Sequence, residues 1–253
     1  TPVTLAARIR RWLVPLAAAA PAAGSAGGAT LDLVESAPVE TSLHHADLPG
    51  AAEVWPAMIG RARTSLEVAQ FYVADAPGEA LGPVIAAVEA AADRGVRVRI
   101  LADATFHRIY PDTLDRLGAL PGIEVRLLDL GPLGGVLHAK YLVVDGRDLF
   151  VGSQNFDWRS LVHVQELGVR TDAPGVVRAF RDVFESDWSV AGGGPAHPAS
   201  IPFAGPDTAV YAGETVRLTP VFSPTGQLPD PALWDLPRLV GLIDGAARTV
   251  RIQ

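Results

Sequence analysis

From Leu31 onward, apolar and polar residues alternate between two spacings. Segments with apolar residues every three or four positions predict helices, and shorter segments that are apolar throughout or alternate with polar residues predict strands. The predicted helices span 51–63, 79–94, 111–119 and 175–188, and the predicted strands span 65–73, 96–101, 123–128, 137–144, 149–152 and 164–170. This alternation predicts a layered α/β fold, a mixed β-sheet flanked by helices on both faces.

The pattern changes after residue 190. Residues 191–233 are rich in Gly and Pro, which favours a linker that follows a first domain spanning 30–190. Within the linker, Val210–Tyr211 and Val216–Leu218 are candidate short edge strands.

The last part of the chain echoes an earlier part. Ile243–Ile252 resembles Ile59–Val68, which lies 184 positions before it, and in both places a helix leads into a strand. Any amphipathic helix followed by a strand gives some such likeness, but self-similarity at a fixed offset is typical of a repeated unit. We therefore interpret 234–253 as the start of a second, truncated repeat.

The first 29 residues have the pattern of an export signal. Arg8, Arg10 and Arg11 precede an apolar run over 12–20, and small residues follow it. Spanning a bilayer takes about 20 consecutive apolar residues, and this run is shorter. We expect a signal peptide on 1–29 and an exported protein, periplasmic or extracellular. A membrane anchor and an unstructured leader are the alternatives.

Net charge and amino-acid composition exclude some classes of binding partner and of metal site. The 253 residues carry a formal charge of -7 at pH 7, which argues against a broad basic surface for nucleic acid. Any nucleic acid must then be held locally, in a cleft. The chain has no cysteine, which excludes a disulfide scaffold and thiolate metal sites.

Candidate chemistry concentrates in one short segment. His138 and Lys140 lie two residues apart in a predicted strand, Asp145 follows, and Ser153 and Asn155 come next. Alternate residues of a strand share one face, so a nucleophilic imidazole and an ammonium group would point the same way. That pairing suits attack on a phosphodiester.

Asp145-Gly146 between alternating apolar residues predicts a β-hairpin. A two-residue loop would place His138 opposite Ser153, and a four-residue loop would place it opposite Asn155. Either register leaves His138, Lys140, Ser153 and Asn155 on one face, whereas a loop of odd length would not.

The spacing H-x-K-x4-D-x6-G-S-x-N resembles the HKD motif of the phospholipase D superfamily. Three further short segments are similar to those of its endolysosomal phospholipase D three/four branch: Leu33–Ser36, Gln70–Tyr72 and Asn155–Leu161. The resemblance covers about 31–188 and implies a phospholipase D-like fold.

The resemblance also implies roles. His138 would form a phosphohistidine intermediate that water or an alcohol resolves. Lys140 and Asn155 would hold the non-bridging phosphate oxygens, Ser153 would assist, and Glu166 would hold the outer nitrogen of the histidine. No metal or other cofactor is needed for this chemistry.

Five other residues complete the candidate site. Asp145 and Gly152 are structural members of the motif, and Asp145 is interpreted as a turn residue that bonds nearby backbone. Phe71 and Tyr72 could stack on a base or line an acyl pocket. His107, at the end of a core strand, is a candidate substrate contact.

Superfamily enzymes use two copies of the motif, and this sequence contains one. The resemblance therefore implies a second half, from a missing C-terminal region or from a homodimer partner. It implies two substrate classes, phospholipid headgroups and single-stranded nucleic acid cut from its 5′ end. A catalytically inactive phosphate-binding module or partner subunit that keeps the fold is the alternative from another class.

Overall fold

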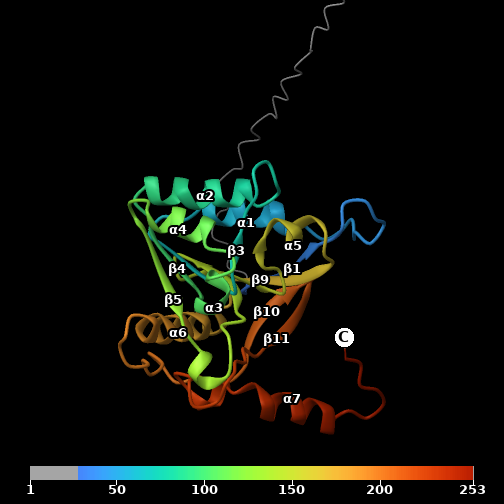
Figure 1. Cartoon of the computed structure of the whole chain (residues 1–253). Coiled ribbons are helices and arrows are strands. Elements are labelled where there is room, and N and C mark those ends of the chain that lie inside the picture. Colours follow the sequence, from blue (N-terminus) through green and yellow to red (C-terminus); the bar gives the residue numbers. More distant parts are fainter. Residues whose placement is uncertain (1–27, 253) are drawn as a thin grey trace, which may run out of the picture.

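A computed structural model describes residues 28–252 (Figure 1). Seven strands form one mixed sheet in the order β1-β9-β7-β6-β2-β4-β5. The strands are β1 (Leu31–Ser36), β2 (Ser65–Gln70), β4 (Arg97–Asp103), β5 (Ile123–Leu128), β6 (Lys140–Val144), β7 (Asp148–Gly152) and β9 (Glu166–Thr171). The neighbours β2, β4 and β5 are parallel and the other pairs are antiparallel.

Helices cover both faces of this sheet, as predicted (Figure 1). One face carries α1 (Ala51–Gly60), α2 (Gly82–Asp93), α4 (Asp112–Gly118) and α5 (Trp158–Val162), and the other carries α6 (Pro174–Ala191). Trp55 and Ile59 of α1 are fully buried on the first face, and Phe184 of α6 is fully buried on the second. The layered α/β fold is confirmed.

Two strands near the motif have bounds that differ from the predictions, and one helix was not predicted. The strand predicted over 65–73 ends at Gln70, and Val73–Ala74 forms a separate short strand, β3, paired with β8 (Phe156–Asp157). The strand predicted over 137–144 begins at Lys140, so His138 lies before it. The short helix α3 (Ala104–His107) was not predicted.

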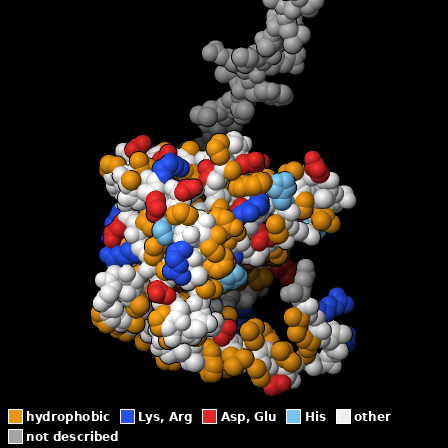
Figure 2. Space-filling view, in the orientation of Figure 1, with side chains coloured by type: hydrophobic (Ala, Val, Ile, Leu, Met, Phe, Trp, Pro, Cys, Tyr) orange, Lys and Arg blue, Asp and Glu red, His pale blue; other side chains and the backbone are white. Residues whose placement is uncertain are grey.

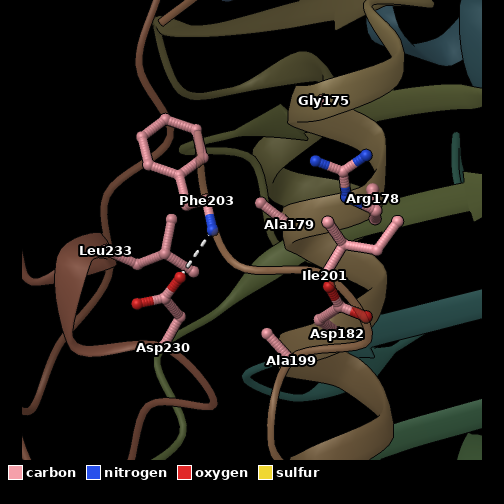
Figure 3. Close-up of a pocket in the computed structure, with 9 residues that line it drawn as sticks. All are labelled: Gly175, Arg178, Ala179, Asp182, Ala199, Ile201, Phe203, Asp230 and Leu233. Atoms are coloured by element: carbon pink, nitrogen blue, oxygen red, sulfur yellow. Dashed lines mark hydrogen bonds between the residues drawn. The ribbon is translucent and has the colours of Figure 1, made fainter. Parts of the chain in front are cut away.

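Residues 191–233 contain more structure than a linker requires. β10 (Asp207–Tyr211) and β11 (Glu214–Leu218) contain the two candidate short strands, and they pair with each other in a two-stranded sheet apart from the main sheet. A single bridge, between Thr30 and Val210, joins β10 to the residue before β1. The segment also folds over α6, where Phe203 N–H donates to the Asp230 carboxylate at 2.6 Å beside a small hollow (Figure 3).

The last helix, α7 (Asp235–Asp244), has no buried residue, and its apolar side chains are visible at the lower edge of Figure 2. Its bounds are those of α1 moved by 184 positions, the offset of the predicted repeat. The exposed Leu239, Leu242 and Ile243 thereby correspond to the buried Trp55, Met58 and Ile59. Residues 249–252, which would correspond to the start of β2, form no strand.

The signal peptide predicted on 1–29 falls almost entirely outside the described residues. Within 28–252, no helix combines the length and the apolar character needed to cross a bilayer.

Candidate active site

The motif lies on the β6–β7 hairpin, whose loop differs from both predicted registers. Val144 pairs with Asp148, so three residues, 145–147, form the loop. An odd loop places Lys140 across from Gly152, and the expected alternation of His138, Lys140, Ser153 and Asn155 on one face of a continuous ladder is wrong. The groups can still meet because β6 begins at Lys140 and β7 ends at Gly152.

Tertiary contacts of Asp145 explain the loop. Its N–H donates to Ser65 O at 2.9 Å, and its carboxylate accepts hydrogen bonds from the N–H groups of Arg63, Thr64 and Ser65 and from the Thr64 hydroxyl. Asp145 adopts a φ of 51° in this position. The bonded backbone belongs to the α1–β2 connection, not to the turn itself. These bonds outweigh the effect of partial burial and lower the pKa of the carboxyl.

Gly152 is required by close packing. A Cβ atom at this position would lie 2.2 Å from Oε1 of Gln154 and 2.8 Å from the Cα of Gly168 in β9. Gln154 is fully buried, and its Nε2 donates to Val34 O of β1 at 3.3 Å. The glycine therefore lets β7 and β9 approach while the chain turns toward Ser153 and Asn155.

Lys140 is the buried cation of the site. Its side chain is 7% exposed, its Nζ donates to His138 O at 3.0 Å, and Nζ lies 5.2 Å from the centre of the Phe71 ring. Burial disfavours the charged ammonium and lowers the pKa of Lys140 to about 8, although the nearby Glu166 carboxylate acts in the opposite direction. At neutral pH the group is still a cation.

His138 stands at the surface, in the irregular segment that leads into β6. The buried Asp103 carboxylate accepts a hydrogen bond from Leu137 N at 2.8 Å and so fixes the backbone beside the histidine. The His138 ring packs 4.6 Å, centre to centre, from the Phe71 ring. This partial desolvation, with the Lys140 charge, lowers the pKa of His138 below its usual value of 6.5. The imidazole is therefore neutral, and nucleophilic, at pH 7.

Ser153 and Asn155 follow the end of β7. The exposed Ser153 is tied to β9: Leu167 N donates to the serine hydroxyl at 3.3 Å, and Ser153 N donates to Leu167 O at 3.1 Å. Asn155 N donates to the Ser160 hydroxyl at 3.1 Å. The Asn155 side-chain oxygen is buried and has no hydrogen-bond partner in the described chain.

Glu166, the first residue of β9, lies near Lys140 and Ser160. Burial raises the pKa of its carboxyl, and Ser160 and Lys140 counteract this in part. One carboxylate oxygen, Oε2, is buried without a partner among the described residues. Within residues 28–252 no hydrogen bond joins Glu166 to His138, so the observed effect of the carboxylate is on Lys140.

The candidate substrate contacts separate into two groups. Phe71 packs against His138, and the adjacent Tyr72 donates from its hydroxyl to the Asp157 carboxylate at 2.8 Å. His107 instead contacts Asp115 of α4, with Nε2 2.7 Å from the carboxylate. This contact already occupies one of the two ring nitrogens. Sequence reasoning missed Phe106, Tyr110 and Arg159, which adjoin Tyr72.

His138 and Ser153 are exposed at the surface. The hollow of Figure 3 is lined by α6 and the 199–233 segment, and a larger hollow is lined by the loop after β1 together with parts of α1 and α5. Neither is lined by His138, Lys140, Ser153 or Asn155. Acidic and basic side chains are interspersed on the face shown in Figure 2.

The family model described as "Cardiolipin synthase, PLD-like domain" matches residues 56–188, just over half of the 253-residue chain. The chain belongs to the phospholipase D-like family. The match includes every motif residue and the strands that position them.

Relatives and a solved structure agree with this membership. The chain is 30% identical to the 5′-3′ exonuclease PLD3 of Bos taurus over 250 residues, which cover 87% of this chain and 49% of the relative. It is 33% identical to phospholipase D Y of Dictyostelium discoideum over 183 residues, covering 66% of this chain and 40% of that protein. The fold is similar to the phospholipase D family member Nuc from Salmonella typhimurium, with a TM-score of 0.51, 22% identity, and coverage of 63% and 94%. The chain spans about half the length of the curated relatives it matches, or less.

Proposed function

We propose that this protein is a phosphodiesterase whose nucleophile is His138. The observation that carries the proposal is the neutral, surface-exposed imidazole directly beside a buried lysine ammonium. A phosphodiester brings negative charge, which would stabilise the ammonium that burial now disfavours. Family membership supports the same conclusion.

In the proposed reaction, a ring nitrogen of His138 attacks phosphorus, and the bond from phosphorus to the leaving oxygen breaks. The leaving oxygen takes a proton from a general acid. Water, or an alcohol in a transfer reaction, then attacks the phosphohistidine and releases the histidine. Lys140 and the Asn155 amide hold the non-bridging oxygens, and Ser153 assists. Glu166 helps to keep Lys140 protonated at neutral pH, and it remains our candidate for orienting the imidazole once substrate is bound.

We further propose that a second motif supplies the general acid. The exposure of His138 and the match of α7 with α1 at an offset of 184 support a second unit that would cover the motif. The unit would come from a further segment of the native chain, and a homodimer is the alternative. Mass spectrometry of the protein from its native host, with light scattering, separates the two. A native monomer with a single motif and full activity would contradict both.

Two substrates test the phosphodiesterase assignment directly. The native protein is incubated with a 5′-labelled single-stranded oligonucleotide and, separately, with phosphatidylglycerol vesicles. We expect turnover of at least one, and we expect His138→Asn to abolish it while the unfolding midpoint stays unchanged. Binding of both substrates without turnover would support the inactive phosphate-binding module instead.

We also propose that the protein is exported. The order of arginines, apolar run and small residues over 1–29 supports this. N-terminal sequencing of the protein from the periplasmic or culture fraction would locate the cleavage site. Recovery of the intact N-terminus in the cytoplasmic fraction would contradict export.

A further inference from the structure

Four aromatic rings form a continuous surface that starts at His138. Phe71 lies 4.6 Å from the His138 ring and 3.8 Å from Phe106, and Tyr72 lies 6.0 Å from Phe106 and 4.8 Å from Tyr110, all measured between ring centres. The Tyr72 and Tyr110 rings are nearly parallel, at 23°. We call Phe71, Tyr72, Phe106 and Tyr110 the aromatic shelf.

The shelf is not part of either hydrophobic core. None of its four members belongs to the buried cluster under α1 and α2 or to the one under α6. Phe71 is 9% exposed, and the other three are half-buried. Phe71 is buried beside the reactive imidazole, whereas Tyr72, Phe106 and Tyr110 keep part of their surface open to a ligand.

Two buried carboxylates hold the shelf in place. Asp103, 1% exposed, accepts hydrogen bonds from Phe106 N and from Leu137 N, so one side chain sets both the shelf and the backbone beside His138. Asp157, 2% exposed, accepts from the Tyr72 hydroxyl at 2.8 Å and from Nη2 of Arg159 at 2.6 Å.

Arg159 adds a cation at the far end of the shelf. Its guanidinium carbon lies 5.8 Å from the centre of the Tyr110 ring, and its side chain is 43% exposed. Asp157 already balances its charge, so the group offers a planar face and donors more than a free positive charge.

We propose that the aromatic shelf stacks the base of the nucleotide that is joined to the phosphate at His138, with Arg159 bordering that base. This proposal rests on the phosphodiesterase function and selects single-stranded nucleic acid, whose bases are unpaired and free to stack. A phospholipid headgroup has no planar ring to place there. The chain carries a formal charge of -7, so stacking would replace the broad basic surface that other nucleic-acid proteins use.

The test compares two oligonucleotides with the same backbone, one with normal bases and one with abasic sites at its 5′ end. Stacking on an aromatic side chain contributes about 1–3 kcal/mol per base, so the native protein should cleave the first about 10- to 100-fold more efficiently in kcat/KM. Tyr110→Ala and Phe106→Ala should each reduce this preference by about tenfold or more. Tyr110→Phe, which keeps the ring, should retain most of it.

Tyr211→Ala, the same type of change at a half-buried tyrosine in the separate β10–β11 sheet, is the matched control and should leave the preference unchanged. Unfolding midpoints verify that each variant folds. An undiminished preference in both alanine variants would overturn the shelf. Equal cleavage of the two oligonucleotides by the native protein, or turnover of vesicles alone, would overturn it too. If the native protein cleaves no phosphodiester at all, the proposed function is refuted instead. Failure of the shelf and failure of the proposed function therefore give different results.

Discussion

The two ends of the β6–β7 hairpin are built in opposite ways. At the turn end, the Asp145 carboxylate is saturated with hydrogen bonds from the α1–β2 connection. At the motif end, the Asn155 side-chain oxygen and Oε2 of Glu166 are buried without partners in the described chain, and Lys140 is buried against its preference for water.

This difference separates stability from function within one motif. Buried polar groups without partners cost free energy, and a role in binding or catalysis is one reason that native proteins keep them. The turn end therefore contributes to folding, and the motif end holds polar groups ready for a ligand. The six residues of H-x-K-x4-D and G-S-x-N form one motif in the sequence, but in the structure they divide into a stabilising end and a functional end.

The largest effect should come from the nucleophile. His138→Asn should lower kcat by about 10⁴-fold or more, because loss of a covalent nucleophile removes the reaction path. The free energy of unfolding should change by less than about 0.5 kcal/mol, since the ring is at the surface. Steady-state kinetics and urea unfolding measure both. A large loss of stability with the loss of activity would show that the motif end is structural.

Asn155→Ala should lower kcat by about 10²- to 10³-fold, the usual cost of removing a donor to a charged transition state. Because its side-chain oxygen has no partner here, stability should be unchanged or slightly higher. Differential scanning calorimetry beside the kinetics gives both values. A fall in the melting temperature with unchanged kcat would show that Asn155 stabilises the fold and does not act in catalysis.

Asp145→Ala should do the opposite and cost about 2–4 kcal/mol of stability, because several backbone donors lose a charged acceptor. The pKa of Asp145 is lower in the folded state, so its contribution is present above the unfolded pKa of about 3.8 and is lost as the pH falls through the folded value. Urea titrations at pH 7 and pH 3 should therefore differ less in Asp145→Asn than in the native protein. The kcat of the folded fraction should stay within about threefold of the native value. A similar pH response in both proteins would count against this account.

The smallest effect concerns pH. Lys140 has a pKa of about 8, so the ammonium needed for phosphate binding is present below that pH and is lost above it. The His138 pKa lies below 6.5, so the neutral imidazole is lost only on the acidic side. The rate in kcat/KM should form a bell with its alkaline limb near pH 8. Lys140→Arg should remove the alkaline limb, and an unchanged limb would assign it to another group.

Much of the fold followed from local patterns. β5 has the predicted bounds, 123–128, because the Pro121-Gly122 turn marks its start and its apolar residues end at Leu128. The motif residues were found because their chemistry is contiguous in the sequence. Their roles stay predictions, and the expected contact between Glu166 and His138 is not formed in the described structure.

Other features could not be read from local patterns. The loop length of the hairpin depends on bonds from Asp145 to residues about 80 positions earlier, which no turn preference encodes. The aromatic shelf draws its rings from two separate segments, and a third contributes Arg159. The one available signal was the short spacing of Asp157 and Arg159, which suits an ion pair beside a neighbouring site.

The long-range bonds of Asp145 also bear on the order of folding. The β6–β7 hairpin is local in sequence and can form early, but β6 is anchored to β2, and β9, the neighbour of β7, is anchored to β1. Closing such distant pairs is slow, because a long loop must be ordered before its contacts form. During synthesis, the complete motif is therefore present in the chain long before it can bind a phosphate. The His138 imidazole reaches its neighbours only when the central sheet is complete.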